Sequence, residues 1–319
     1  MGVVKNRRVS RRSRFWVSLI ATFIIIGIAS FGITLVVCSF MNSNMSPITS
    51  NLDEENSEES LDGPAEPAPA EETIQPIDFQ PVIDEWIKTV KGNESILIYD
   101  LDLDEVAGSY NVKEEYNTAS LYKLFVVYEG YKRIYDKKWD PNAKAGSTGK
   151  TIAKCLDLAI RESHSPCAET LWNMIGHDNL DNTIEKDWKI TDSDISKLTS
   201  NVNDIMLIMK RFYEHPDFND PTLLDPMWDS FLNQPNTTYE WRQGLPSGFS
   251  KASVYNKVGW AYNAEGKYWN IYHDAAIVKF PWQDKTRDFI VVVMTNKVDF
   301  KNIRQFGKML EDKFYEDEI

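Results

Sequence analysis

The feature that most limits how this chain can fold is an uncharged apolar segment close to its N-terminus. Residues 15–40 contain no Asp, Glu, Lys or Arg over 26 positions. A helix needs about 20 apolar residues to cross a bilayer core, so the segment predicts a transmembrane helix. Residues 1–14 hold six Lys or Arg and no acid, and such basic flanks remain in the cytoplasm. We therefore expect a single-pass protein of the cell membrane, with a basic cytoplasmic tail at 1–14 and an extracytoplasmic C-terminal domain. A cleaved signal peptide is the alternative, but its apolar core is usually only about 7–15 residues long.

An acidic, proline-containing segment separates the predicted membrane helix from the rest of the chain. Residues 41–78 include the runs DEENSEE and PAEPAPAEE. A segment so polar cannot bury enough surface to offset its conformational entropy, so we expect a disordered linker. Residues 79–319 remain, and this length is sufficient for one substantial domain.

Charge and the spacing of histidine and cysteine limit the partners. The net charge of −13 argues against nucleic acid, whose binding depends on clustered Lys and Arg. The histidines, at positions 164, 177, 215 and 273, show no metal-ligand spacing, so we expect neither a metal site nor a cofactor. Cys155 and Cys167 either form a disulfide in an oxidising exterior or remain two free thiols in the core, whereas Cys38 lies in the predicted membrane segment.

The hydrophobic pattern along residues 79–319 predicts the order of elements. Residues 78–92 have helical spacing, and 95–102 and 105–111 have the pattern of strands. A helical region follows at 151–215, with Thr151, Ser165 and Thr199 as start signals, and then three strand-like segments and a last amphipathic helix, at 251–263, 270–280, 288–296 and 300–316. Late strands joined by short turns indicate an antiparallel sheet. We expect an α+β domain whose two terminal helices cover one face of this sheet, while an all-helical subdomain, about 140–240, packs on the other.

Ser120 and Lys123 are the first candidate pair for chemistry. They lie three residues apart in TASLYKL, at the start of an amphipathic helix for which Thr118 suits the N-cap, and side chains at this spacing share one face. A serine hydroxyl becomes a nucleophile when a base removes its proton, and lysine is a base only when neutral. The pair alone is weak evidence, because Ser147 and Lys150 repeat the spacing in AGSTGKT. We interpret that second stretch as a turn rather than a phosphate loop, since a required glycine is missing.

Further residues with suitable chemistry follow along the chain. Ser163 lies at a helix junction in AIRESHSPC, and Lys257 and Gly259 lie on a predicted edge strand in YNKVGWAYN. A second lysine would hold Lys123 neutral and attract a substrate carboxylate, while the glycine would let a ligand backbone approach the strand. Trp260 is equally consistent with a core residue and with a platform for substrate.

In this order the motifs resemble those of the penicillin-recognising serine hydrolases, most closely the class A β-lactamases. TASLYKL is similar to the Ser-x-x-Lys motif of that family, SHSPCAETLWNMIG to its Ser-Asp-Asn segment, and KVGWA to its Lys-Thr-Gly motif. The resemblance covers roughly residues 79–319. It implies that Ser120 is the acylated nucleophile, that Lys123 is its base and that Ser163 relays a proton to the leaving nitrogen. It also implies substrate-binding roles for Ser165, Lys257, Gly259 and Ala261, the last near the second backbone donor of an oxyanion hole.

Three positions depart from the pattern of that family. His164 and Ser165 replace Asp-Asn, which removes a substrate-binding amide, and Val258 replaces a threonine of the carboxylate pocket. Between residues 176 and 199 there is no Glu-x-x-Leu-Asn, although the acids Glu185, Asp187 and Asp194 are present. Without a positioned carboxylate to activate water, an acyl-enzyme would hydrolyse slowly, so we expect inefficient β-lactam turnover.

Two functions from different classes follow. The first is a membrane-anchored serine hydrolase that acts through a Ser120 acyl-enzyme on a β-lactam or on a D-Ala-D-Ala-like cell-wall peptide. The second is a cell-wall-binding or scaffold protein that keeps the fold with an eroded site. The three departures support the second function, and the intact Ser120–Lys123 pair opposes it. A Ser/Lys peptidase of another fold does not account for the other motifs and their order.

Overall fold

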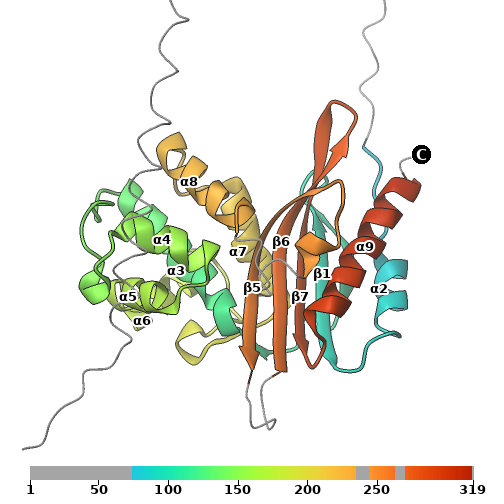
Figure 1. Cartoon of the computed structure of the whole chain (residues 1–319), viewed down its shortest axis with the longest axis horizontal. Coiled ribbons are helices and arrows are strands. Elements are labelled where there is room, and N and C mark those ends of the chain that lie inside the picture. Colours follow the sequence, from blue (N-terminus) through green and yellow to red (C-terminus); the bar gives the residue numbers. More distant parts are fainter. Residues whose placement is uncertain (1–73, 235–243, 263–269, 318–319) are drawn as a thin grey trace, which may run out of the picture. The chain divides into compact units, whose positions relative to one another are not determined.

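A five-stranded antiparallel sheet lies at the centre of the computed structural model, which describes residues 74–234, 244–262 and 270–317 (Figure 1). The sheet order is β2-β1-β7-β6-β5, so β5 is an edge strand. The strands are β1 (Asn93–Asp100), β2 (Glu105–Tyr110), β5 (Ser253–Tyr262), β6 (Asn270–Trp282) and β7 (Lys285–Asn296). The predicted α+β class and the predicted antiparallel sheet are therefore confirmed.

The two terminal helices cover one face of the sheet, as predicted (Figure 1). These are α2 (Gln80–Trp86) and α9 (Phe300–Asp317), and the rings of Trp86 and Phe306 lie 4.9 Å apart between them. The sequence predicted that the first helix would continue to Gly92, but it ends at Trp86. The reason is local: both the backbone N–H and the hydroxyl of Thr89 donate to the Trp86 carbonyl, which closes the helix as a tight turn.

Six helices pack on the opposite face and form the larger of the two apolar cores (Figure 1). They are α3 (Tyr122–Tyr135), α4 (Ile152–Arg161), α5 (Ser165–Ile175), α6 (His177–Lys186), α7 (Val202–Glu214) and α8 (Pro221–Leu232). Thr151 caps α4 as predicted. The predicted start at Ser165 is confirmed, since α5 begins there, although His164 Nδ1 supplies the cap. The predicted start at Thr199 is wrong, because α7 begins at Val202 and Asn201 caps it.

The predicted tail at 1–14, the predicted membrane helix at 15–40 and most of the predicted linker at 41–78 lie outside the described residues. The prediction of a disordered linker is wrong for its last five residues, 74–78, because Ile77 is buried in the core beside α2 and Arg287 donates to the Gln75 carbonyl. Among the residues that the structure does describe, none of the helices has the length and apolar character needed to span a bilayer.

Candidate active site

Ser120 lies in a short turn that is held from several sides. The turn is the 3₁₀ helix η2 (Ala119–Leu121), directly before α3. The side-chain oxygen of Asn117 accepts the Ala119 N–H at 3.0 Å, and the Thr118 N–H donates to the Leu198 carbonyl at 2.8 Å. The Thr118 hydroxyl does not cap the helix, which corrects the prediction, since these neighbouring groups hold the turn instead. Ala119 adopts a φ of +44°, an unfavourable value for a residue with a Cβ and one that often marks functional sites.

A buried histidine holds the segment that precedes this turn. His273, on β6, is fully buried, and its Nδ1 accepts the Thr295 N–H at 2.9 Å. The proton therefore lies on Nε2, which donates to the Asn117 carbonyl at 2.9 Å. Burial lowers the pKa of His273 to about 4, so the ring is neutral at physiological pH. Sequence reasoning treated this histidine as ordinary, because nothing in its spacing pointed to Asn117.

Gly259 allows strand β5 to approach the Ser120 turn closely. A Cβ at this position would lie 2.7 Å from the Thr118 carbonyl oxygen and 3.0 Å from Leu121 Cγ. The chain's own backbone therefore approaches β5 at this glycine, and the approach of a ligand backbone to the strand stays a prediction. Ala261, two residues further along β5, is half-buried and pairs with Ile271 of β6.

The side chain of Val258 lies on the opposite face of β5 from those of Lys257 and Gly259, because successive side chains of a strand point to opposite faces. Val258 is buried in the core beneath α2 and α9. Its departure from threonine thus affects packing in that core rather than the face that carries Lys257 and Gly259. Trp260 is 44% exposed, which excludes the interpretation as a core residue.

Two buried lysines meet on one serine. Lys123 Nζ donates to the Ser163 carbonyl at 2.5 Å and lies 3.2 Å from Ser163 Oγ and 3.1 Å from Ser165 Oγ. Lys257 Nζ lies 3.0 Å from the same Ser163 Oγ. The predicted residues Lys123, Ser163, Ser165 and Lys257 are therefore brought together. Among the described residues, no hydrogen bond joins Lys123 to the half-buried Ser120.

Burial determines the protonation of the two lysines. It lowers the pKa of Lys123 to about 8, against a smaller raising effect of the Glu169 carboxylate. Burial and the charge of Lys123 lower the pKa of Lys257 well below its usual range. The repulsion between the two amines agrees in direction with the sequence interpretation, in which a second lysine favours a neutral Lys123. With a pKa of about 8, Lys123 can lose its proton near neutral pH.

The junction between α4 and α5 presents both serines to Lys123. Ser163 has a φ of +52°, and a disulfide joins Cys155 of α4 to Cys167 of α5, so of the two alternatives for these cysteines the structure contains the pair. His164, between the two serines, accepts the Cys167 N–H through Nδ1 at 3.1 Å. It is therefore a structural cap.

The three acids considered between residues 176 and 199 do not contact this cluster. Glu185 and Asp187 are exposed at the end of α6. Asp194 caps the short helix Ile195–Lys197, and its carboxylate pairs with Lys197 Nζ at 2.6 Å. Within the described part of the chain, no group of three or more His, Cys, Asp or Glu side chains is arranged to hold a metal ion.

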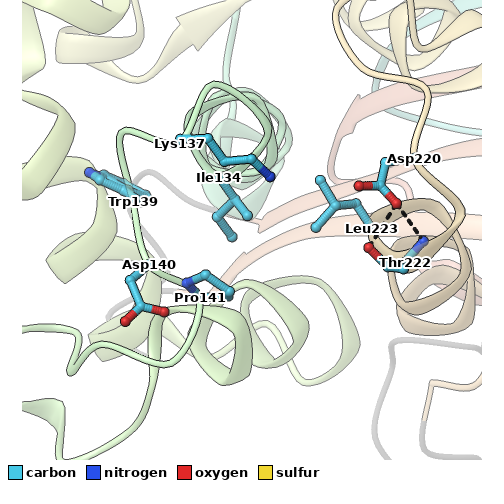
Figure 2. A pocket seen from close by; sticks show the side chains of 8 residues that line it. All are labelled: Ile134, Lys137, Trp139, Asp140, Pro141, Asp220, Thr222 and Leu223. Atoms are coloured by element: carbon cyan, nitrogen blue, oxygen red, sulfur yellow. Dashed lines mark hydrogen bonds between the residues drawn. The ribbon is translucent and has the colours of Figure 1, made fainter.

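A hollow of about 370 Å³ lies elsewhere, where the end of α3 faces the start of α8 (Figure 2). Its lining residues are Ile134, Lys137, Trp139, Asp140, Pro141, Asp220, Thr222 and Leu223. None of them belongs to the lysine–serine cluster. Figure 2 shows the Asp220 carboxylate turned toward Thr222, from whose N–H and hydroxyl it accepts hydrogen bonds, so this acid serves to begin α8.

Comparison with known proteins gives a consistent result. Residues 78–314 match the model of the beta-lactamase enzyme family. A variant of the reconstructed last common ancestor of Gram-negative class A β-lactamases has a TM-score of 0.61 and 15% identity, over 73% of this chain and 97% of that one. A variant of the extended-spectrum β-lactamase TLA-1 has a TM-score of 0.63 and 12% identity, over 74% of this chain and 98% of that one. A class A β-lactamase from Bacteroides cellulosilyticus has a TM-score of 0.61 and 13% identity, over 74% of this chain and 96% of that one. No curated protein matches the chain.

Proposed function

This chain belongs to the beta-lactamase enzyme family, and on that premise we propose that it is a serine hydrolase which forms an acyl-enzyme through Ser120. The proposed substrates are β-lactams or D-Ala-D-Ala-like cell-wall peptides. Residues 15–40 are proposed to anchor it as a single-pass protein of the cell membrane, with residues 41–73 as a tether that extends the domain outside the cytoplasm.

The observation that carries the proposal is the contact of Ser163 Oγ with the amines of both lysines. Neutral Lys123 removes the proton of the Ser120 hydroxyl as its oxygen bonds to the substrate carbonyl carbon. When the carbon–nitrogen bond breaks, Ser163 donates its proton to the leaving nitrogen and regains one from Lys123. The proton of Ser120 thus ends on the leaving group. Lys123 must turn from the Ser163 carbonyl toward Ser120, a tightening that is common when substrate binds.

Substrate recognition follows from the edge strand. A carboxylate placed beside Lys257 would raise the pKa of this lysine and be held by the resulting ion pair. As the outermost strand of the sheet, β5 offers backbone groups to an extended peptide or to a lactam amide. The substrates proposed above share this chemistry, a reactive carbonyl close to a carboxylate.

A second function, a non-catalytic wall-binding or scaffold protein, is favoured by one observation. The acids at 185, 187 and 194, in the segment where the family carries its water-activating Glu, do not contact the lysine–serine cluster. A scaffold would bind wall peptides without a covalent step, so covalent labelling distinguishes the two functions.

The test uses the full-length chain in detergent, incubated with a labelled penicillin and analysed by intact mass. We expect one covalent adduct, which Ser120→Ala abolishes. Ser147→Ala is the matched control, because Ser147 and Lys150 have the same spacing as Ser120 and Lys123. The Ser147→Ala variant should be labelled like wild type. If neither a penicillin nor an acyl-D-Ala-D-Ala ester forms an adduct or is hydrolysed, the enzyme proposal is refuted in favour of the scaffold.

A further inference from the structure

We propose that Glu169, on helix α5, is the carboxylate that activates water to hydrolyse the Ser120 acyl-enzyme. This inference rests on the proposed function and deepens it. The water-activating carboxylate of the family is expected between residues 176 and 199, and here helix α5, outside that segment, would supply it. Glu169 is exposed, so a water molecule can reach it.

The geometry of α5 directs Glu169 toward the lysine–serine cluster. Ser165 and Glu169 are four residues apart, so their side chains lie on one face of the helix, about 6 Å apart along its axis. Ser165 Oγ is 3.1 Å from Lys123 Nζ, which fixes this face beside Lys123. Glu169 therefore lies one helical turn from a direct contact with the proposed base.

Aromatic packing places the next turn of α5 against the same region. Trp172, three residues after Glu169, has its ring 5.1 Å from that of Tyr122, and Lys123 Nζ lies 5.8 Å from the Tyr122 ring centroid. Ser165 and Trp172 thus fix α5 against α3 on both sides of Glu169. The glutamate lies beside the buried face of α5, where that face meets solvent.

The electrostatics agree with this placement. Glu169 is the acid whose charge raises the pKa of Lys123, against the larger effect of burial. After burial, the same carboxylate is the second cause of the raised pKa of Tyr122. Both effects agree with a carboxylate on the side of α5 that faces the start of α3.

The proposed step balances without a further reactant. Glu169 accepts a proton from water, the water oxygen bonds to the acyl carbonyl carbon, and the ester bond to Ser120 Oγ breaks. The proton passes from Glu169 through a bridging water molecule and Lys123 to Ser120 Oγ. The products are the free carboxylic acid and the regenerated hydroxyl.

The experiment separates formation of the acyl-enzyme from its decay. The full-length chain in detergent is acylated with benzylpenicillin, excess drug is removed, and the adduct is followed by intact mass in wild type, Glu169→Gln and Glu185→Gln. Removal of a general base slows its step by about 10²- to 10⁴-fold. We expect Glu169→Gln to form the adduct at a rate within a few-fold of wild type, but to lose it at least about 100-fold more slowly. Glu185→Gln, a change in an exposed acid of α6, should behave as wild type.

Each result has a distinct meaning. Equal decay in wild type and Glu169→Gln, or a wild-type adduct that persists for hours, overturns the role of Glu169 and leaves the proposed acylation intact. Absence of any wild-type adduct or turnover refutes the proposed function and this inference with it. A variant that changes only the apparent pKa of acylation, with unchanged decay, assigns Glu169 an electrostatic effect on Lys123 and also overturns the proposal.

Discussion

Replacing Lys123 by Met should change how the stability of the protein depends on pH. Burial lowers the pKa of Lys123 from 10.5 to about 8. Each pKa unit corresponds to about 1.4 kcal/mol, so carrying the charge at neutral pH costs the folded state about 3 kcal/mol. Between pH 8 and 10.5 the unfolded chain binds more protons than the folded one, so wild-type stability rises with pH in this window.

The variant lacks this titration, so its unfolding free energy relative to wild type should fall with rising pH. From pH 7 to pH 10 we expect the difference between the two proteins to shrink by between about 2 and 3 kcal/mol. Loss of the hydrogen bonds to Ser163 and Ser165 shifts the difference by a constant amount, which does not affect this slope. Lys257 remains in both proteins. In the variant the charge of Lys123 no longer lowers the pKa of Lys257, and this makes the pH-dependent part of the stability difference larger, not smaller.

Denaturant unfolding of both proteins at several pH values between 7 and 10, followed by circular dichroism, measures this difference directly. Lys186→Met is the matched control, since Lys186 is exposed at the end of α6 and its replacement should give a difference that does not vary with pH. A Lys123→Met difference that stays constant within about 0.5 kcal/mol over this range would refute the inference that a protonated Lys123 is buried in the folded state.

Three further predictions concern the supports of the site. Between pH 7 and pH 4, the wild-type protein should lose about 3 kcal/mol of unfolding free energy that the His273→Gln variant does not lose. The reason is that the pKa of His273 is about 4 in the folded state and 6.5 in the unfolded state, so the unfolded chain binds the proton first as the pH falls. Denaturant titrations at several pH values measure this difference. The double change Cys155→Ala with Cys167→Ala should lower the unfolding free energy by about 2–4 kcal/mol, and reductant should destabilise only wild type. Gly259→Ala should slow Ser120 acylation at least about tenfold, measured by adduct formation, because its Cβ displaces the Thr118 carbonyl; a wild-type rate would contradict the close approach of the strand.

The fold class could be predicted because it follows from hydrophobic periodicity and from the order of the elements. The apolar runs of β6 and β7, and the helical repeats of α4 and α7, are long enough to define their elements. That the two lysines and Ser163 form one site was implied by the resemblance of three motifs, in their order, to those of the class A β-lactamases. Helix ends were less predictable, since an imidazole at 164 and an amide at 201 competed successfully with nearby hydroxyls for the caps.

The supporting contacts could not be predicted, because they join residues that are distant in sequence. The hydrogen bond from His273 to Asn117 spans 156 positions, and no local pattern distinguishes this histidine from the others. Gly259 was recognised as a site of close approach, but what approaches it depends on how η2 lies against β5. The only local signal for Glu169 is its four-residue spacing from Ser165, which gains meaning once Ser165 is seen beside Lys123.

The energetics of the site bear on the choice between enzyme and scaffold. Lys123 and Lys257 are almost completely buried, and burial opposes the charge of both. Ala119, which precedes Ser120, and Ser163 itself add left-handed backbone conformations that cost about 1–3 kcal/mol each. A scaffold would need neither the amines nor the strained backbone, and apolar side chains of similar size would fill the same space at lower free energy. Acyl transfer needs a lysine that loses its proton near neutral pH beside a bridging hydroxyl. The free-energy cost of the buried amines and of the strained backbone is therefore expected in an enzyme, whereas a scaffold would have no function that requires it.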